Sequence, residues 1–273
     1  MQIKIVAEGG IAHGGDLQYA KKLIKVATFA GCDYIKWQKR TPELCVPESQ
    51  KNKPKQTPWG VISYIDYKKR IEFGEKEYQE IYKICNEEGI ECFASVWDIP
   101  SCDFMKRFTT IGKIPSALIT NTELCQYARK CFNTLMVSTG MSDEEEIESC
   151  VRACDPDVIF HTNSTYPCPE EELNLLYIRH LIEKYPDKSV GYSGHEFGLL
   201  TTQVTPLLGV QYIERHICLN RTDWISDCMA SVEPHGLIKL VKGIRNVEKA
   251  LGTKGPRKVM GGELEKRKSL RGT

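Results

Sequence analysis

Short apolar runs alternate with longer amphipathic stretches along most of the chain. Eight runs rich in β-branched and aromatic residues predict strands, at Ile3 to Ala7, Tyr34 to Trp37, Glu91 to Ser95, Ile111 to Ile114, Leu135 to Ser138, Val158 to His161, Val190 to Ser193 and Gln211 to His216. Apolar residues at helical spacing predict helices between them, at Leu17 to Phe29, Glu75 to Glu88, Glu123 to Cys131, Asp143 to Ala153, Glu170 to Lys184, Leu199 to Leu208 and Pro234 to Leu251.

Strand and helix in strict alternation imply a parallel sheet. Eight such repeats in 273 residues favour a closed (β/α)8 TIM barrel over an open doubly wound sheet. We therefore expect an α/β protein whose residues 1–273 form a single barrel domain.

Two segments fall outside this alternation. A long loop at about residues 39–72 follows the second strand, and a loop of this length in a compact domain is usually a lid, a binding loop or a disordered segment. Trp59, Tyr64 and Tyr67 predict that its second half packs against the domain. A basic tail after Gly252 is too short for a second domain.

Composition excludes several classes of function. The 37 Lys and Arg residues nearly balance 36 Asp and Glu, so no global field attracts nucleic acid or an anionic membrane. No apolar run approaches the roughly 20 residues that span a bilayer, and the first strand does not resemble a signal peptide. We expect a cytoplasmic protein. Its 12 cysteines are scattered without a CxxC pair, which favours reduced, buried thiols over disulfides or zinc.

Polar residues stand where each predicted strand ends, which in a barrel is where active sites are built. In chain order they are Glu8, Lys36 with Gln38, Ser95, Lys113 with Ser116, Ser138 with Thr139, His161 with Asn163 and Ser164, Ser193 with His195, and His216. Taken singly, a serine here caps a helix, a lysine is solvated and a histidine is structural. Their convergence on one rim favours a site.

The chemistry of this set is coherent. Lys36 and Lys113 predict a cradle for phosphate and carboxylate groups, together with the hydroxyls of Ser95, Ser116, Ser138 and Ser193. His195 and His216 are candidates to share a divalent metal. Glu8 and Asp227 supply carboxylates for proton transfer or for holding sugar hydroxyls. The set points to carbon–carbon bond chemistry on a phosphorylated carboxylic acid or a sugar phosphate.

Two glycine-containing motifs do not change this interpretation. The run from Gly9 to Gly15 lacks the GxGxxG spacing of a dinucleotide loop. The run from Ser138 to Met141 lacks the GxSxG frame of a serine hydrolase.

The sequence resembles the sialic acid synthase family, the phosphoenolpyruvate-dependent synthases of nonulosonic acids, in the barrel domain. The resemblance rests on blocks in family order, which include Ala7 to Asp16, Ala30 to Gln38, Thr57 to Gly60, Arg70 to Phe73, Lys113 to Ser116, Ser138 to Ser142, His161 to Pro169, Gly191 to His195, Glu214 to His216 and Ser231 to Pro234. It implies that phosphoenolpyruvate and a hexose-type aldose condense to a 3-deoxy-2-keto sugar acid and phosphate.

The resemblance also implies roles. By motif, the ligands of a manganese or magnesium ion fall on His195 and His216. The phosphoenolpyruvate site falls on Lys36 and Lys113, with Ser95, Ser116, Ser138 and Ser193 as hydroxyl partners. Glu8 is the candidate to orient or deprotonate water. The positions that face the acceptor fall on Gln38, Ser164, Tyr166 and Asp227.

Three features differ from the family pattern. Ala12 replaces the usual Asn, and Gly194 replaces the usual Asp before the metal-binding histidine. We also expect the protein to lack the C-terminal antifreeze-protein-like domain of most members, whose arginine contacts the acceptor's acyl-amino group across a dimer. The sequence therefore does not identify the acceptor sugar or whether it carries an acyl-amino group. We also expect a homodimer that forms through barrel faces.

Two other functions are compatible with the residues. A Schiff-base pyruvate aldolase would use Lys36 or Lys113 if the lysine pKa is depressed. A non-catalytic barrel that binds sugar acids would keep the anion site without turnover.

Overall fold

The computed structural model describes residues 2–272 and places eight parallel strands in a closed barrel, in the order β1-β10-β9-β8-β7-β6-β5-β2. The predicted (β/α)8 barrel is confirmed. The barrel strands are β1 (Lys4–Gly10), β2 (Tyr34–Lys39), β5 (Glu91–Val96), β6 (Ile111–Ile114), β7 (Thr134–Ser138), β8 (Val158–Thr162), β9 (Ser189–Gly194) and β10 (Tyr212–His216).

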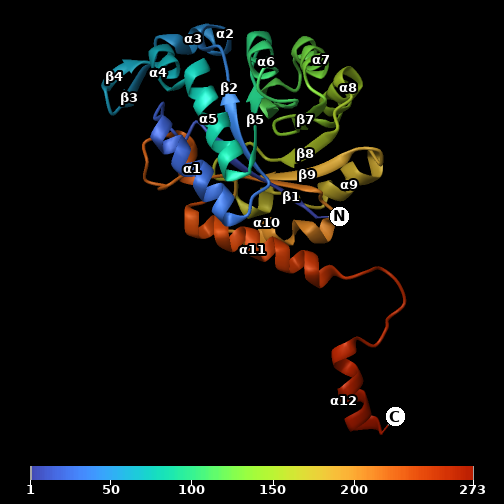
Figure 1. Ribbon diagram of the computed structural model, residues 1–273. Coiled ribbons are helices and arrows are strands. Elements are labelled where there is room, and N and C mark those ends of the chain that lie inside the picture. The colour runs from blue at the N-terminus through green and yellow to red at the C-terminus, as the bar shows by residue number, and fades with distance from the viewer. Residues whose placement is uncertain (1, 273) are drawn as a thin grey trace.

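After each barrel strand the chain returns through a helix that covers the outside of the barrel (Figure 1). These helices are α1 (Leu17–Ala30), α5 (Glu75–Glu88), α6 (Ile99–Met105), α7 (Thr122–Cys131), α8 (Glu144–Cys154), α9 (Tyr177–Lys184), α10 (Leu200–Val204) and α11 (Pro234–Leu251). The residues that begin and end these helices can be identified in the sequence, as α1 illustrates. The Asp16 carboxylate caps α1 by accepting from the backbone N–H groups of Gln18 and Tyr19, and Gly31 ends the helix in the left-handed conformation at φ 86°.

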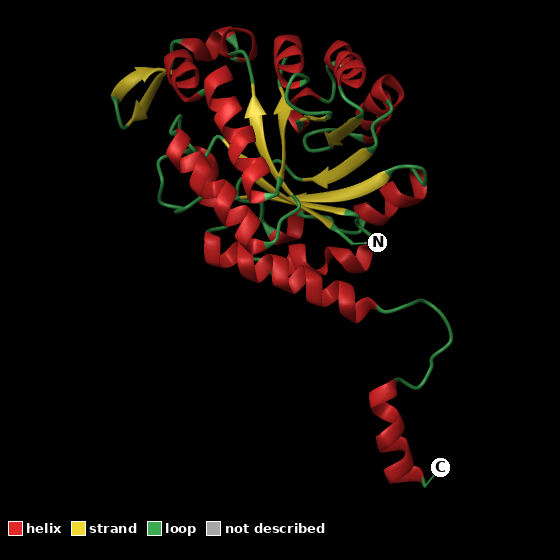
Figure 2. Ribbon diagram, in the orientation of Figure 1, coloured by secondary structure: helices red, strands yellow, loops and turns green. Residues whose placement is uncertain are grey.

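The long connection between β2 and α5 is ordered rather than structureless. It forms α2 (Pro42–Cys45), α3 (Glu48–Lys51), a hairpin of β3 (Pro54–Thr57) and β4 (Gly60–Ser63), and α4 (Tyr64–Ile71). The hairpin stands apart from the barrel sheet in Figure 2. Tyr67 is buried, and Trp59 and Tyr67 each pack edge-on against Trp224, so the second half of the segment packs as expected.

Two predicted helices are wrong in extent. The segment expected at Glu170 to Lys184 is a short 3-10 helix, η2 (Glu170–Glu172), followed by α9, and Asn174 between them has a positive φ of 45°. The segment at Leu199 to Leu208 divides into α10 and η3 (Thr205–Leu208), where Pro206 removes a backbone donor. Two other 3-10 helices are η1 (Ser116–Leu118) and η4 (Ser226–Ala230).

The tail after α11 forms one more helix, α12 (Gly261–Arg271), which has no buried residue. It lies away from the barrel in Figure 1. No helix among the described residues has the length and apolar character to cross a membrane.

Candidate active site at the carboxyl ends of the strands

The interior of the barrel changes from apolar to polar along the strands. Successive side chains of a strand point to opposite faces, so residues two apart both point inward. The amino-terminal halves place an apolar cluster inside, made by Val6, Tyr34, Phe93, Met136, Val158 and Phe160. Two residues later the interior side chains are charged or hydroxylated, as in Glu8 after Val6 and Lys36 after Tyr34. The apolar layer thus forms the floor of a polar site.

A cavity of about 260 Å³ opens above this floor. Every predicted site residue except Asp227 lines it, namely Glu8, Lys36, Gln38, Ser95, Lys113, Ser116, Ser138, Ser164, Tyr166, Ser193, His195 and His216. Asp227 lines a larger cavity of about 940 Å³, which shares Gln38, Tyr166 and His216 with the first. We call them the inner cavity and the outer cavity. The structure therefore places the predicted residues at one mouth of the barrel.

Glu214 is the central site residue that the sequence reasoning missed. Its Oε2 accepts from Lys113 Nζ at 2.8 Å, and its Oε1 lies 3.6 Å from Lys36 Nζ. Ser193 Oγ also donates to Oε1 at 3.2 Å. The signal was present in the sequence, because Glu214 lies two residues before His216 on β10 and so shares its inward face.

The two lysines differ in electrostatic environment although both are buried. Burial lowers the pKa of Lys113 to about 8, and the single carboxylate of Glu214 does not offset it. Burial acts on Lys36 in the same direction, but Glu214 and Glu8 together raise its pKa above the ordinary value. For Glu214, burial is outweighed by Lys113 and Lys36, which hold its pKa at about 2. Lys36 and Glu214 are thus charged near neutral pH, while Lys113 is close to titration.

Glu8 is held by two partners, and its carboxylate and that of Asp227 both lie near Gly10. Its Oε2 lies 2.8 Å from Lys36 Nζ, and its Oε1 accepts from Gln38 Nε2 at 3.0 Å. A Cβ atom built on Gly10 would lie 3.1 Å from Glu8 Oε1 and 3.6 Å from Asp227 Oδ2. Gly10 also has a positive φ of 51°, so both conformation and space require glycine.

Serine hydroxyls also line the inner cavity. Ser116 Oγ accepts from the backbone N–H of Gly140 at 3.1 Å, and Ser95 Oγ contacts the Trp37 carbonyl at 3.4 Å. Gly140 allows this approach, because a Cβ there would lie 2.2 Å from Ser164 Oγ and 2.9 Å from Ser116 Oγ. A glycine after β7 therefore lets hydroxyls from two further loops converge.

The imidazoles of His195 and His216 meet at the junction of the two cavities, with ring centroids 5.3 Å apart. His195 Nδ1 contacts the Asn163 carbonyl and so carries the proton, which leaves the Nε2 lone pair toward Tyr166 OH at 2.9 Å. Burial, with the neighbouring His216, lowers the pKa of His195 to about 3, so the ring is neutral. Two adjacent imidazoles, one with a fixed tautomer, are a donor set that fits a divalent ion.

Glu196 fills the space left by Gly194. A Cβ on Gly194 would lie 2.4 Å from Glu196 Oε2, and this carboxylate accepts from Tyr192 OH at 2.9 Å. Its Oε1 pairs with Arg215 Nη1 at 3.2 Å. Because Glu196 follows His195 and Arg215 precedes His216, this fully buried pair links the two strand ends that carry the imidazoles.

His161 stands at a strand end but lies outside the site. It falls between the inward positions of β8, and its Nε2 contacts the Leu173 carbonyl at 2.7 Å. His13 is also structural, since it stacks on Phe73 at 3.9 Å and its Nδ1 accepts from the backbone N–H of Gly15.

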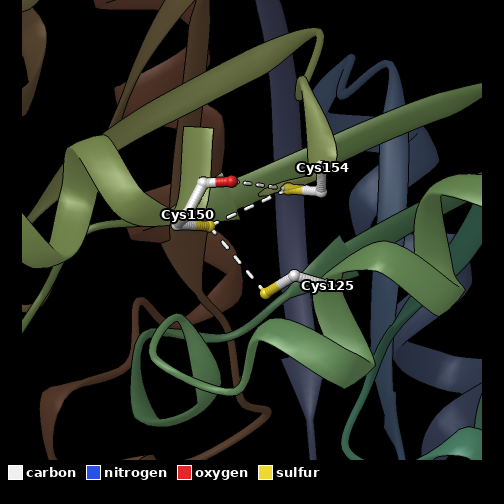
Figure 3. Close-up of side chains that lie close together, drawn as sticks. All are labelled: Cys125, Cys150 and Cys154. Atoms are coloured by element: carbon white, nitrogen blue, oxygen red, sulfur yellow. Dashed lines mark hydrogen bonds between the residues drawn. The ribbon is translucent and has the colours of Figure 1, made fainter. Parts of the chain in front are cut away.

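Three cysteines form a separate cluster between α7 and α8 (Figure 3). Cys150 Sγ lies 3.9 Å from Cys125 Sγ and 3.8 Å from Cys154 Sγ. Cys154 Sγ also contacts the Cys150 carbonyl at 3.3 Å, and Cys125 Sγ contacts the Ile119 carbonyl at 3.6 Å. All 12 cysteines are free, and these three pack as buried thiols, of which Cys125 and Cys154 have carbonyl acceptors.

Comparison with known proteins places this geometry in a family. A model described as the NeuB family matches residues 23–255. The chain is 32% identical over 256 residues to the N-acetylneuraminate-9-phosphate synthase of Homo sapiens, covering 91% of this chain and 71% of that protein. It is 30% identical over 282 residues to the N,N'-diacetyllegionaminic acid synthase of Legionella pneumophila, covering 98% and 78%.

A solved structure supports the same family assignment. The N-acetylneuraminic acid synthetase from Leptospira borgpetersenii, in complex with citrate, superposes with a TM-score of 0.86 at 30% identity and covers 99% of this chain and 93% of that chain. The barrel with its polar mouth, the family match over most of the chain and these relatives agree: the chain belongs to the NeuB family of sialic acid synthase-type enzymes.

Proposed function

We propose that this protein condenses phosphoenolpyruvate with the open-chain form of a hexose-type aldose, giving a nonulosonic 3-deoxy-2-keto sugar acid and phosphate. The methylene carbon of phosphoenolpyruvate bonds to the aldehyde carbon, water adds to the neighbouring carbon, and phosphate leaves. The observation that carries the proposal is the convergence of two lysines, two imidazoles and Glu8 on one small cavity in a barrel of this family.

The charged groups of the inner cavity position the first substrate. Lys36 and Lys113 neutralise phosphate and carboxylate oxygens, and Glu214 holds both ammonium groups in place. The hydroxyls of Ser95, Ser116, Ser138 and Ser193 supply further donors around the same cavity. Such positioning and electrostatic stabilisation account for most of the catalysis expected here.

His195 and His216 would hold a divalent ion, for which we propose manganese or magnesium. When bound, the ion supplies Lewis acidity at the developing alkoxide of the aldehyde. Gln38, Ser164, Tyr166 and Asp227 would hold the acceptor hydroxyls beside it. Glu8 would orient the attacking water and remove its proton, since its carboxylate lines the inner cavity beside Lys36.

Two variants test these roles. Glu8→Gln should retain phosphoenolpyruvate binding and lose turnover, and full activity would remove Glu8 from the mechanism. The double variant His195→Ala, His216→Ala should hold no stoichiometric metal by elemental analysis, whereas the parent protein should hold one ion. Retention of the ion by the double variant would place the metal site elsewhere.

One observation favours the aldolase alternative: burial lowers the pKa of Lys113, as a Schiff-base lysine requires. An experiment distinguishes the two reactions. Borohydride trapping with pyruvate should leave no adduct, while phosphate release should depend on phosphoenolpyruvate and metal. A covalent adduct on Lys113 would instead support the aldolase. Tight sugar-acid binding without turnover would support the non-catalytic barrel. A cytoplasmic location and a homodimer remain predictions.

A further inference from the structure

The cysteine cluster between α7 and α8 lies outside the site described above (Figure 3). Cys125 lies on α7, and Cys150 and Cys154 lie four residues apart on α8, a spacing that places both on one face of the helix. All three side chains are buried. Within residues 2–272, no other set of three His, Cys, Asp or Glu side chains brings its ligand atoms within 4.8 Å of one another. The fold thus assembles one three-sulfur group from residues that the sequence keeps apart.

The spacing of the three sulfur atoms suits coordination of a single ion. Cys150 Sγ lies 3.9 Å from Cys125 Sγ and 3.8 Å from Cys154 Sγ, and the third separation is within 4.8 Å. An ion in the plane of three atoms at these separations would lie about 2.1 to 2.5 Å from each, which includes the roughly 2.3 Å of a zinc–thiolate bond. The three sulfurs can therefore bind one ion without a rearrangement of the two helices.

The cluster favours one negative charge. The thiols of Cys150 and Cys154 lower the pKa of Cys125, because they donate hydrogen bonds to its thiolate. Cys125 in turn raises the pKa of both neighbours. Burial opposes any further negative charge, since a thiolate is poorly solvated in an apolar interior. One thiolate beside two neutral thiols is a donor set for a cation of low charge.

The surroundings of the sulfurs also favour a positive charge. The Ile119 carbonyl oxygen lies 3.6 Å from Cys125 Sγ, and the Cys150 carbonyl oxygen lies 3.3 Å from Cys154 Sγ, so the negative ends of two dipoles adjoin the cluster. Arg129, one turn after Cys125 on α7, acts on the pKa of Cys154. Its charge is already balanced, because its Nη1 donates to Asp157 Oδ2 at 2.7 Å. A bound cation would therefore be the principal counter-charge of the sulfurs.

We propose that Cys125, Cys150 and Cys154 bind a thiophilic metal ion that joins α7 to α8, and that copper(I) is the ion they fit best. Thiolates select soft ions such as copper(I) and zinc over manganese and magnesium. Structural zinc takes four protein ligands, whereas copper(I) is satisfied by three sulfurs. In the described part of the chain, no fourth His, Cys, Asp or Glu side chain brings a ligand atom within 4.8 Å of all three. Binding displaces thiol protons to solvent.

The first test titrates copper(I) into reduced, chelator-treated protein without oxygen, in competition with a coloured copper(I) chelator. The protein carries His195→Ala and His216→Ala, so the imidazoles at the barrel mouth cannot contribute. We expect one ion per chain to resist the chelator and to add thiolate-to-metal absorption in the ultraviolet, while manganese adds none. If the chelator removes all the copper, or if zinc displaces it from the protein, the proposal is overturned.

Cysteine variants in the same background test the ligands. Cys150→Ala removes the sulfur that contacts both others, and it should weaken copper(I) binding by at least about 100-fold, because the loss of a residue that merely supports a ligand costs about 10- to 100-fold. The matched control is Cys102→Ala, which removes an equally buried thiol from α6, outside the cluster. It should bind copper(I) as the background protein does. Equal affinities of the two variants would contradict the three-sulfur site.

A spectroscopic measurement keeps the proposal testable even if Cys150→Ala does not fold. X-ray absorption of the copper-loaded background protein should show three sulfur neighbours at about 2.3 Å and no nitrogen neighbour. The melting temperature of the same sample should rise by several degrees with copper(I), because the ion binds the folded state, and it should stay unchanged with manganese. Two sulfur neighbours, or a nitrogen neighbour, would place the copper at other residues and overturn the proposal.

Discussion

Glu214 Oε2 accepts a 2.8 Å hydrogen bond from Lys113 Nζ at the base of the inner cavity, where both side chains are almost fully buried. The same carboxylate lies 3.6 Å from Lys36 Nζ. One negative charge thus supports two cations inside the barrel. This arrangement keeps the lysines fixed before a substrate arrives, at the cost of burying three charged groups.

Glu214→Gln should therefore destabilise the fold and reduce activity. Removing the charge leaves two buried ammonium groups with less compensation, and we expect a loss of about 3 kcal/mol in the free energy of unfolding. Urea denaturation measures this loss. The control is Glu80→Gln, which breaks the exposed pair with Lys21 and should cause no measurable change. Equal stability of Glu214→Gln and the parent protein would contradict the ion pair.

Gly10→Ala should separate backbone strain from damage to the site. Gly10 and Gly89 both have positive φ, at 51° and 71°, so alanine should cost about 1 kcal/mol of stability at either position. Only at Gly10 would the new Cβ approach Glu8 and Gln38, whereas nothing lies within 4 Å of the Gly89 Cβ position. We expect turnover to fall in Gly10→Ala and to persist in Gly89→Ala. Similar turnover in both variants would show that the Glu8 position tolerates displacement.

His13 should make the protein less stable in acid. Burial, followed by the charge of Arg40, lowers its folded-state pKa to about 3, so the unfolded chain binds a proton near the ordinary value of 6.5 while the folded chain does not. Stability is therefore present above about pH 6.5 and is lost as the pH falls from there toward 3, by about 1.4 kcal/mol per pH unit.

Comparison with His13→Asn isolates this contribution, because other titrating groups are common to both proteins. Urea titrations between pH 7 and pH 4 should show a shallower loss of stability in the variant. Parallel pH profiles would mean that His13 is protonated in the folded protein.

Thiol reactivity should follow burial. Cys32, Cys45 and Cys131 are partly exposed, while Cys125, Cys150 and Cys154 are buried between α7 and α8. Maleimide labelling of the folded protein followed by peptide mass analysis should modify the first three before the others. Denatured protein, in which all 12 should react, provides the control. Rapid labelling of Cys150 in the folded protein would indicate that the two helices separate.

The alternation of apolar runs and amphipathic segments was sufficient to predict the barrel, because each strand buries both faces and each helix buries one. The strand ends also identified the cavity residues, since inward positions recur every two residues and the carboxyl ends meet at one mouth. Helix limits such as those at Asn174 and Pro206 were less accurate, because local breaks interrupt an otherwise helical period.

The sequence alone determined which side chains reach the mouth of the barrel, because strand periodicity fixes their direction. Only the tertiary structure decided how their charges are shared. Glu214 pairs with Lys36, which is 178 positions away in the sequence, and with Lys113, which is 101 positions away. Glu196 occupies the space beside Gly194. Only the fold decides such pairings, since counter-charges depend on distances between segments that the sequence keeps apart.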